Sequence, residues 1–183
     1  MKRIYLIVVA VFLSHMEMDA QKFSVSTNLL GYAALGTMNL DASYALSRRW
    51  SLVAGVIYNP FSFSSGEDQY QMRQLSYCLG ARLWPWHIWS GWWFASKIRY
   101  QEYNMGGILS PQTEEGDRIG AGLYSGYTYM VSRHFNMEFG LGFWAGLDKY
   151  RKYSCPKCGL TLQQGDRAFI LPDDLIVSLV YVF

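Results

Sequence analysis

The segment FNMEFGLGFWAGLD, residues 135–148, alternates strictly between two kinds of side chain. Its odd positions are all apolar: Phe135, Met137, Phe139, Leu141, Phe143, Ala145 and Leu147. Its even positions carry three glycines, one tryptophan, one asparagine and the acids Glu138 and Asp148. A period of two predicts an extended strand with two different faces. Bulky apolar side chains opposite glycines and a few ions are typical of a strand that separates lipid from a narrow interior.

Seven more segments repeat this pattern, and together they predict the fold. They are Phe23 to Leu29, Met38 to Leu46, Trp50 to Tyr58, Leu75 to Leu83, Trp92 to Tyr100, Ile119 to Val131 and Leu175 to Phe183. The segments have about the length that a tilted membrane strand requires. Only a closed barrel satisfies every backbone group of strands in hydrocarbon. The sequence therefore predicts an all-β protein, an eight-stranded antiparallel up-and-down transmembrane β-barrel.

The connections between these segments alternate in length. Short polar connections are expected around Arg48, Trp86 and Arg133, and longer ones at Ser62 to Gln71, Asn104 to Gly116 and Tyr150 to Ala168. Short periplasmic turns opposite longer outer loops are the usual asymmetry of such barrels. All five prolines, Pro172 among them, are expected at segment ends or in loops, where a ladder tolerates them.

The first 20 residues predict a secretory signal peptide. Lys2 and Arg3 precede an apolar run from Ile4 to Leu13, which is too short to span a bilayer, and small Ala20 follows. We expect cleavage after Ala20, so that residues 21–183 form the barrel. The whole chain has 17% aromatic residues, only 16% charged residues and a net charge of +2. This composition suits contact with lipid and argues against a nucleic-acid partner.

Charged residues on the glycine face predict the content of the lumen. Eight strands enclose an interior that side chains can fill, and buried charges need partners. We expect the carboxylates of Asp41, Glu138 and Asp148 to pair there with cationic side chains in a packed plug. The cations on that face are Arg82, Lys97, Arg99 and Arg118. The alternative interpretations of the same residues are an ion path and a catalytic pair.

The cysteines and histidines predict no chemistry of their own. Cys155 and Cys158 form a C-x-x-C motif in the last long connection, where an exported location favours a disulfide over a labile redox pair. Cys78 is expected on the lumen face as a free thiol. A lipid-modifying enzyme needs a nucleophile beside a histidine, but His87 and His134 fall in predicted turns. We therefore expect no enzyme, with no catalytic, cofactor-binding or metal residue and no cofactor.

The chain also resembles a family of small Bacteroidetes outer-membrane proteins, domain of unknown function 3575. The resemblance lies in VSTNLLGYAALGTMNLDASYALSRRWSLVAGVIYNPF, ARLWPW, RYQEYNMGGI, SRHFNMEFGLG and CPKCG, and so covers nearly all of the chain after residue 20. Its most specific pieces are Thr27 to Leu30, Tyr58 to Pro60 and Tyr103 to Gly107. This sequence has Gly91-Trp92-Trp93 where the family pattern has a histidine after the glycine. The resemblance implies a barrel encoded near fimbrillin-type surface proteins and assigns no activity.

These observations lead to one functional hypothesis. The protein is expected in the outer membrane of a Gram-negative bacterium, as a barrel with a plugged, non-conducting lumen. It would act as a structural or accessory envelope protein that anchors or docks surface components such as fimbriae through its outer loops. Its expected partners are outer-membrane lipid, fimbrial or other surface proteins, and the barrel assembly machinery, which would read the terminal strand that ends at Phe183. The alternatives are a lipid-modifying barrel enzyme and a small channel.

Overall fold

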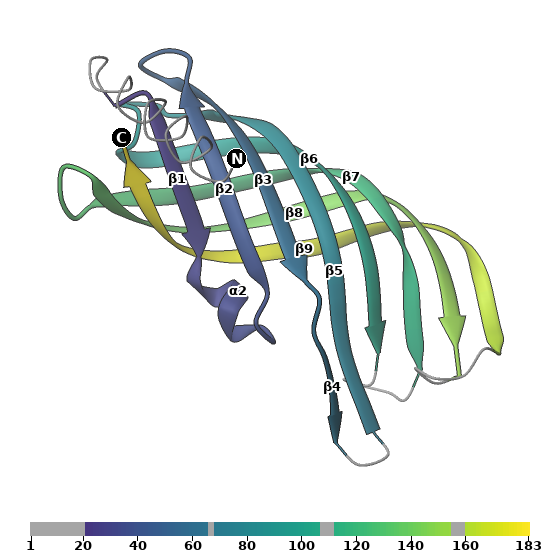
Figure 1. Ribbon diagram of the computed structural model, residues 1–183. Coiled ribbons are helices and arrows are strands. Elements are labelled where there is room, and N and C mark those ends of the chain that lie inside the picture. Colours follow the sequence, from purple (N-terminus) through teal and green to yellow (C-terminus); the bar gives the residue numbers. More distant parts are fainter. Residues whose placement is uncertain (1–20, 66–67, 107–111, 155–159) are drawn as a thin grey trace, which may run out of the picture.

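A computed structural model describes residues 21–65, 68–106, 112–154 and 160–183. It contains nine strands and one short helix (Figure 1). The elements are β1 (Phe23–Asn28), α2 (Leu29–Ala33), β2 (Met38–Ala45), β3 (Trp50–Asn59), β4 (Ser62–Ser65), β5 (Asp68–Leu83), β6 (Gly91–Gly106), β7 (Thr113–Met130), β8 (Phe135–Tyr153) and β9 (Thr161–Val182). The predicted signal peptide and the Cys155/Cys158 motif lie outside the described residues. Among the residues that are described, no helix is long and apolar enough to cross a membrane.

Eight of these strands close into an antiparallel barrel. Each strand pairs with its neighbour in the chain, β3 pairs directly with β5, and β1 pairs with β9 to complete the ring. Strand β4 is a short addition that pairs with β5 beside the ring. The predicted eight-stranded barrel is confirmed, and closure leaves no unpaired edge in the ring.

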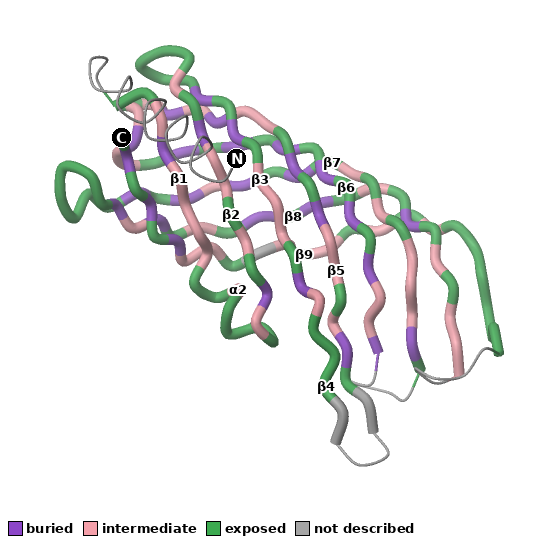
Figure 2. Tube along the Cα trace, viewed as in Figure 1, coloured by how far each residue is buried: buried purple, intermediate pink, exposed green. Residues whose placement is uncertain are grey.

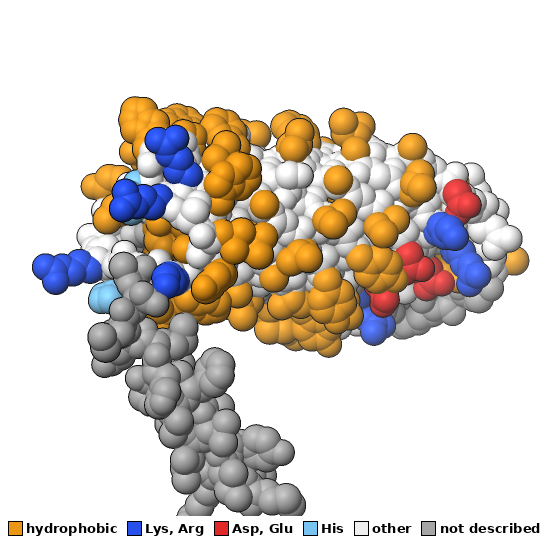
Figure 3. All heavy atoms as spheres, turned by 90° about the horizontal axis from the view of Figure 1, so that it is seen from above, with side chains coloured by type: hydrophobic (Ala, Val, Ile, Leu, Met, Phe, Trp, Pro, Cys, Tyr) orange, Lys and Arg blue, Asp and Glu red, His pale blue; other side chains and the backbone are white. Residues whose placement is uncertain are grey.

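The two faces of the strands also follow the prediction. Along β6 and β8, buried and exposed residues alternate (Figure 2). In β8 the apolar side chains of Phe139, Leu141 and Phe143 are about half exposed on the outside, whereas Glu138 and Asp148 are buried inside. We call the exposed apolar ring around the outside of the barrel the apolar belt. It includes Leu52, Tyr77, Leu79, Phe94, Ile98, Ile119, Leu123, Phe139, Leu141, Phe143, Leu147, Ile170 and Leu175. It covers the middle of the barrel, and charged side chains gather toward the two ends (Figure 3).

The strands run further than the sequence predicted. The three long connections expected at the outer end are largely strand, because β5 begins at Asp68, β6 continues to Gly106, β7 begins at Thr113, β8 continues to Tyr153 and β9 begins at Thr161. We call residues 68–74, 101–106, 113–118, 148–153 and 161–169, nearly all of them outside the predicted strands, the outer extension. The sequence pattern did not predict these strands, because polar side chains lie on both of their faces. This part of the barrel lies beyond the apolar belt and needs no apolar face.

Strand β9 corrects the prediction for Pro172. This proline lies inside the strand, next to a β-bulge at which Leu141 pairs with Leu175 while Phe143 pairs with Pro172. Two residues of β9 thus oppose the single residue Gly142. A bulge of this kind switches which side chains face inward. The inward residues of β9 are therefore even-numbered on the C-terminal side of the bulge and odd-numbered on its N-terminal side. That change of parity is why sequence alternation found only residues 175–183 of a 22-residue strand.

Candidate functional site in the barrel lumen

An aromatic cluster fills the lumen at the end that carries the short turns and the C-terminus. Trp84 and Trp93 are fully buried there, Trp89 is nearly so, and Val180 and Val182 of β9 pack against them. The rings of Trp84 and Trp89 meet edge to face at 5.6 Å. The Trp84 indole donates a hydrogen bond to Ser51 Oγ (3.1 Å), and the Trp89 indole donates to the carbonyl of Gln21 (2.7 Å). This tryptophan cluster closes the turn end of the lumen with apolar side chains.

The first ion pair lies next to the tryptophan cluster, on the side away from the short turns. Arg82 of β5 places one guanidinium nitrogen, Nη1, 2.8 Å and 3.0 Å from the two carboxylate oxygens of Glu138 on β8. Thr128 on β7 donates a third hydrogen bond to that carboxylate at 3.1 Å. The guanidinium also lies over the ring of Trp93, 4.3 Å from its centroid. Both charged side chains are at most 5% exposed, so the pair crosses a water-poor section of the lumen.

Two further pairs occupy the middle of the lumen. Lys97 Nζ lies 2.9 Å from the carboxylate of Asp41 on β2. Arg99 forms an ion pair with Asp173, which also accepts a hydrogen bond from the hydroxyl of Tyr124. Asp173 reaches the interior because it lies at the β9 bulge, which turns its side chain inward. Sequence reasoning missed this acid, although the adjoining proline was the available signal for an irregularity in the strand.

The glycines of the opening segment make room for the aromatic side chains in this interior. A Cβ atom added to Gly142 would lie 2.1 Å from the ring of Tyr124. One added to Gly140 would lie 3.1 Å from the ring of Trp93 and 2.7 Å from the carbonyl of Ser125. Side chains larger than hydrogen do not fit at either position, because neighbouring atoms already fill the space.

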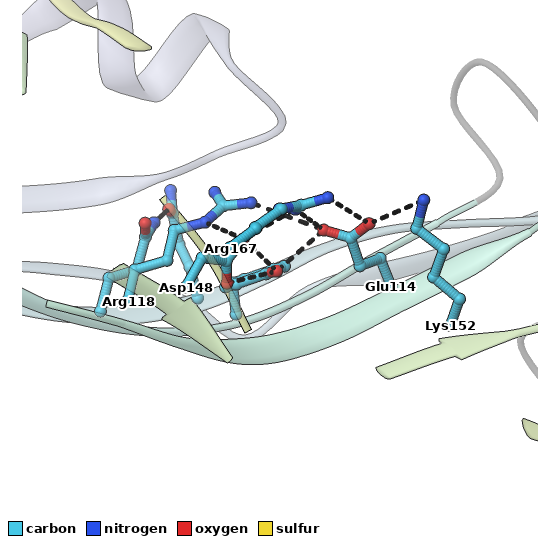
Figure 4. A network of polar contacts seen from close by, with 8 residues as sticks. Glu114, Arg118, Asp148, Lys152 and Arg167 are labelled. Carbon is cyan, nitrogen blue, oxygen red and sulfur yellow. Dashed lines mark hydrogen bonds and ion pairs between the residues drawn. The ribbon is translucent and has the colours of Figure 1, made fainter. Parts of the chain in front are cut away.

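A charged network fills the inner side of the outer extension (Figure 4). Fully buried Asp148 lies 3.2 Å from Arg118 Nε and accepts hydrogen bonds from Arg167 at 2.7 Å and 2.9 Å. Glu114 forms ion pairs with Arg167 and, at 3.5 Å, with Lys152.

Tyr103 joins the two acids of this network, because its hydroxyl lies 2.8 Å from Glu114 and 2.9 Å from Asp148. Burial on its own would raise the pKa of Glu114, but hydrogen bonds from Arg167 and Tyr103 outweigh it and hold that pKa below its ordinary value.

The predicted lumen charges are therefore brought together, with additions. Asp41 pairs with Lys97, Glu138 with Arg82, and Asp148 with Arg118, as a packed interior requires. Sequence reasoning missed Asp173, Glu114 and Arg167. The last two fell in segments interpreted as loops, where the alternation of Glu114, Gly116 and Arg118 on one face was the signal available.

The remaining sequence predictions also find their places. Cys78 is a buried free thiol on the lumen face, as expected. His87 lies in the turn between β5 and β6, and His134 lies in the turn between β7 and β8, where its ring stacks on Tyr181. Neither histidine reaches the charged interior. Within the part of the chain that the structure describes, no three His, Cys, Asp or Glu side chains gather as metal ligands do.

Comparison with known families assigns the chain to a family. A family model described as "Protein of unknown function (DUF3575)" matches residues 5–183. The chain belongs to the DUF3575 family. A comparison of this DUF3575 protein with curated proteins finds no match. In this family member, then, the barrel encloses a tryptophan cluster, three stacked ion pairs and an outer charged network.

Proposed function

We propose that this DUF3575 barrel is a structural or accessory protein of the outer membrane of a Gram-negative bacterium, with a lumen that does not conduct ions. The observation that carries the proposal is the filled interior beneath an apolar exterior. Large apolar side chains such as Leu123 (72% exposed) and Leu175 (65% exposed) point away from the barrel. Their exposure would be costly in water, whereas it is favourable in lipid.

The lumen contents support a closed interior. Among the described residues, the cluster of Trp84, Trp89 and Trp93 packs the turn end with apolar side chains, and the Arg82–Glu138 pair crosses the lumen next to it. A continuous water column would require both to move. The channel alternative is therefore disfavoured, and the enzyme alternative is disfavoured because both histidines lie in turns. We propose that the protein has no catalytic activity.

The outer extension supports a docking role. Strands β5–β9 rise beyond the apolar belt and carry charged side chains on their outer face, among them Glu102, Asp117, Lys149 and Asp166. A polar wall that stands clear of the lipid is suited to contact with other envelope or surface proteins, such as fimbrial components. The terminal strand, with Tyr181 and Phe183 at its end, would be read by the barrel assembly machinery.

Electrophysiology and gel mobility test the proposal together. Protein refolded in detergent should migrate differently before and after boiling, because a closed barrel has no strand edge to fray. The same sample in planar lipid bilayers should give no steady single-channel current. A stable, ion-selective current would refute the closed lumen, and identical migration would refute the membrane barrel. Cross-linking in native outer membrane, followed by mass spectrometry, would identify the docked component.

A further inference from the structure

The barrel wall is uneven in height, and this leaves an opening on one side of its outer end. Strands β1, β2 and β3 have 6, 8 and 10 residues, whereas β5 to β9 have 16 to 22. Helix α2 lies on the rim of this low wall, well short of the far ends of β5–β9 (Figure 1). The lumen can therefore be reached from the side, over α2.

A cavity of about 220 Å³ lies behind this rim. It is lined by Asn28, Gly31 and Ala34 at the rim and by Lys97 and Arg99 in the interior. The Asp41 side chain, which pairs with Lys97, is 26% exposed, whereas those of Glu138 and Asp173 are only 2% and 4% exposed. Of these ion pairs, the Lys97–Asp41 pair is therefore the one that a ligand entering the cavity would contact first. The cavity has the volume of about seven water molecules, and its charged lining suits a small polar group rather than a hydrocarbon chain.

The charge of the cavity lining favours an anion. Among the described residues that line it, four are cationic (Arg82, Lys97, Arg99 and Arg118) and three are acidic (Asp41, Glu138 and Asp173). The acid that balances the fourth cation, Asp148, is fully buried and does not line the cavity. Arg82 is 4% exposed, and its Nε–H has no hydrogen-bond partner within the described chain. A buried donor of this kind is costly unless a ligand or water accepts its hydrogen.

The rim itself is apolar on its outer side. Leu29, Leu30, Tyr32 and Leu35 of α2 and the residues after it are 36% to 46% exposed. The neighbouring strand β2 carries exposed Leu40, so this surface is continuous with the apolar belt. An apolar outer side and a small-residue inner side (Gly31 and Ala34) allow one molecule to place a chain outside and a head group inside.

We infer that the lumen cavity binds the anionic head group of a single-chain membrane amphiphile, which enters over α2 and leaves its chain against the apolar belt. The head-group chemistry is a phosphate or carboxylate, and the source is the membrane rather than a free anion. This inference rests on the proposed membrane location of the barrel. It adds a ligand site to that proposed role and requires no conduction through the lumen.

Native mass spectrometry of the full-length mature protein in dodecyl maltoside tests the inference, with dodecyl phosphate as the probe. One dodecyl phosphate should be retained per protein, with an affinity at least about tenfold higher than that of dodecylphosphocholine, equivalent to about 1.4 kcal/mol. Ala34→Trp should weaken binding by at least about tenfold, because the indole fills the entrance. Ala33→Trp is the matched control, since Ala33 is the adjacent exposed residue at the end of α2 but does not line the cavity.

Three outcomes would overturn the inference. They are equal retention of dodecyl phosphate and dodecylphosphocholine, full competition by inorganic phosphate at equal concentration, and unchanged binding in Ala34→Trp. The double variant Asp41→Asn/Lys97→Met, which keeps the pair neutral, should also lose the preference for phosphate. Gel mobility of each variant reports barrel closure separately. Failure of ligand binding in a heat-modifiable barrel would therefore refute this inference and leave the proposed function standing.

Discussion

Removal of the Glu138 carboxylate is the sharpest test of the packed lumen. In Glu138→Ala, the Arg82 guanidinium, whose side chain is 5% exposed in the unmodified protein, loses both of its contacts with that carboxylate, at 2.8 Å and 3.0 Å. A buried cation left without its partner costs about 3–5 kcal/mol. We therefore expect the free energy of unfolding to fall by about that amount, because the guanidinium that remains is almost fully buried.

The measurement is urea unfolding of the barrel in lipid vesicles, followed by tryptophan fluorescence and by gel mobility. The double variant Arg82→Met/Glu138→Leu removes both charges and should recover most of the loss, since an apolar pair of similar volume is often neutral or stabilising. Ser178→Ala is the matched control. Ser178 lies opposite Glu138 in the register, is buried, and carries no charge. Its loss should cost about 1 kcal/mol or less.

Two results would refute this reasoning. A cost below about 1 kcal/mol for Glu138→Ala would mean that water from the adjoining cavity solvates Arg82, and that the pair is not desolvated as its burial indicates. A steady current through Glu138→Ala, with the stability unchanged, would mean that the ion pair is a gate. The expected result is lower stability with no gain of conductance, because the tryptophan cluster still closes the turn end.

Three other perturbations test the faces, the packing and the outer network. Leu141→Arg in the apolar belt should lower the free energy of unfolding in vesicles by about 2–4 kcal/mol. Leu162→Arg in the outer extension, at an equally exposed position, should leave that free energy nearly unchanged. Equal losses in the two variants would mean that the apolar belt does not contact lipid. Gly142→Val should destabilise the barrel by about 1–3 kcal/mol, because the added side chain displaces the Tyr124 ring that packs on Gly142. Gly165→Ala should unfold like the unmodified protein, because the nearest neighbour of its added Cβ atom would be 3.7 Å away. The lowered pKa of Glu114 means that its carboxylate stabilises the fold fully above its ordinary pKa of 4.5, and that this stabilisation is lost as the pH falls through the lower folded-state pKa. Glu114→Gln should therefore be less stable than the unmodified protein at pH 7, and the difference should shrink below pH 4.5; a difference independent of pH would exclude the ion pairs as its cause.

The sequence by itself determined the class of fold and the side of each strand. Successive side chains of a strand point to opposite faces, so the alternation of Phe139, Gly140, Leu141 and Gly142 distinguished outward from lumen positions without knowledge of any partner strand. The same rule placed Glu138 and Arg82 inside correctly. It worked wherever one face was apolar, because only there does the pattern differ between the faces. In the outer extension both faces carry polar side chains, and the strands there were interpreted as loops.

Only the tertiary structure decided which charges meet. Arg82 and Glu138 are 56 residues apart, and Arg99 and Asp173 are 74 apart, so their contacts depend on how the strands are staggered around the closed ring. Stagger is a property of the whole barrel, and a single bulge beside Pro172 changes it for the rest of β9. The bulge turns Asp173 inward, and the unequal strand lengths leave the low wall under α2. Neither follows from local alternation, because both depend on how each strand pairs with its neighbour.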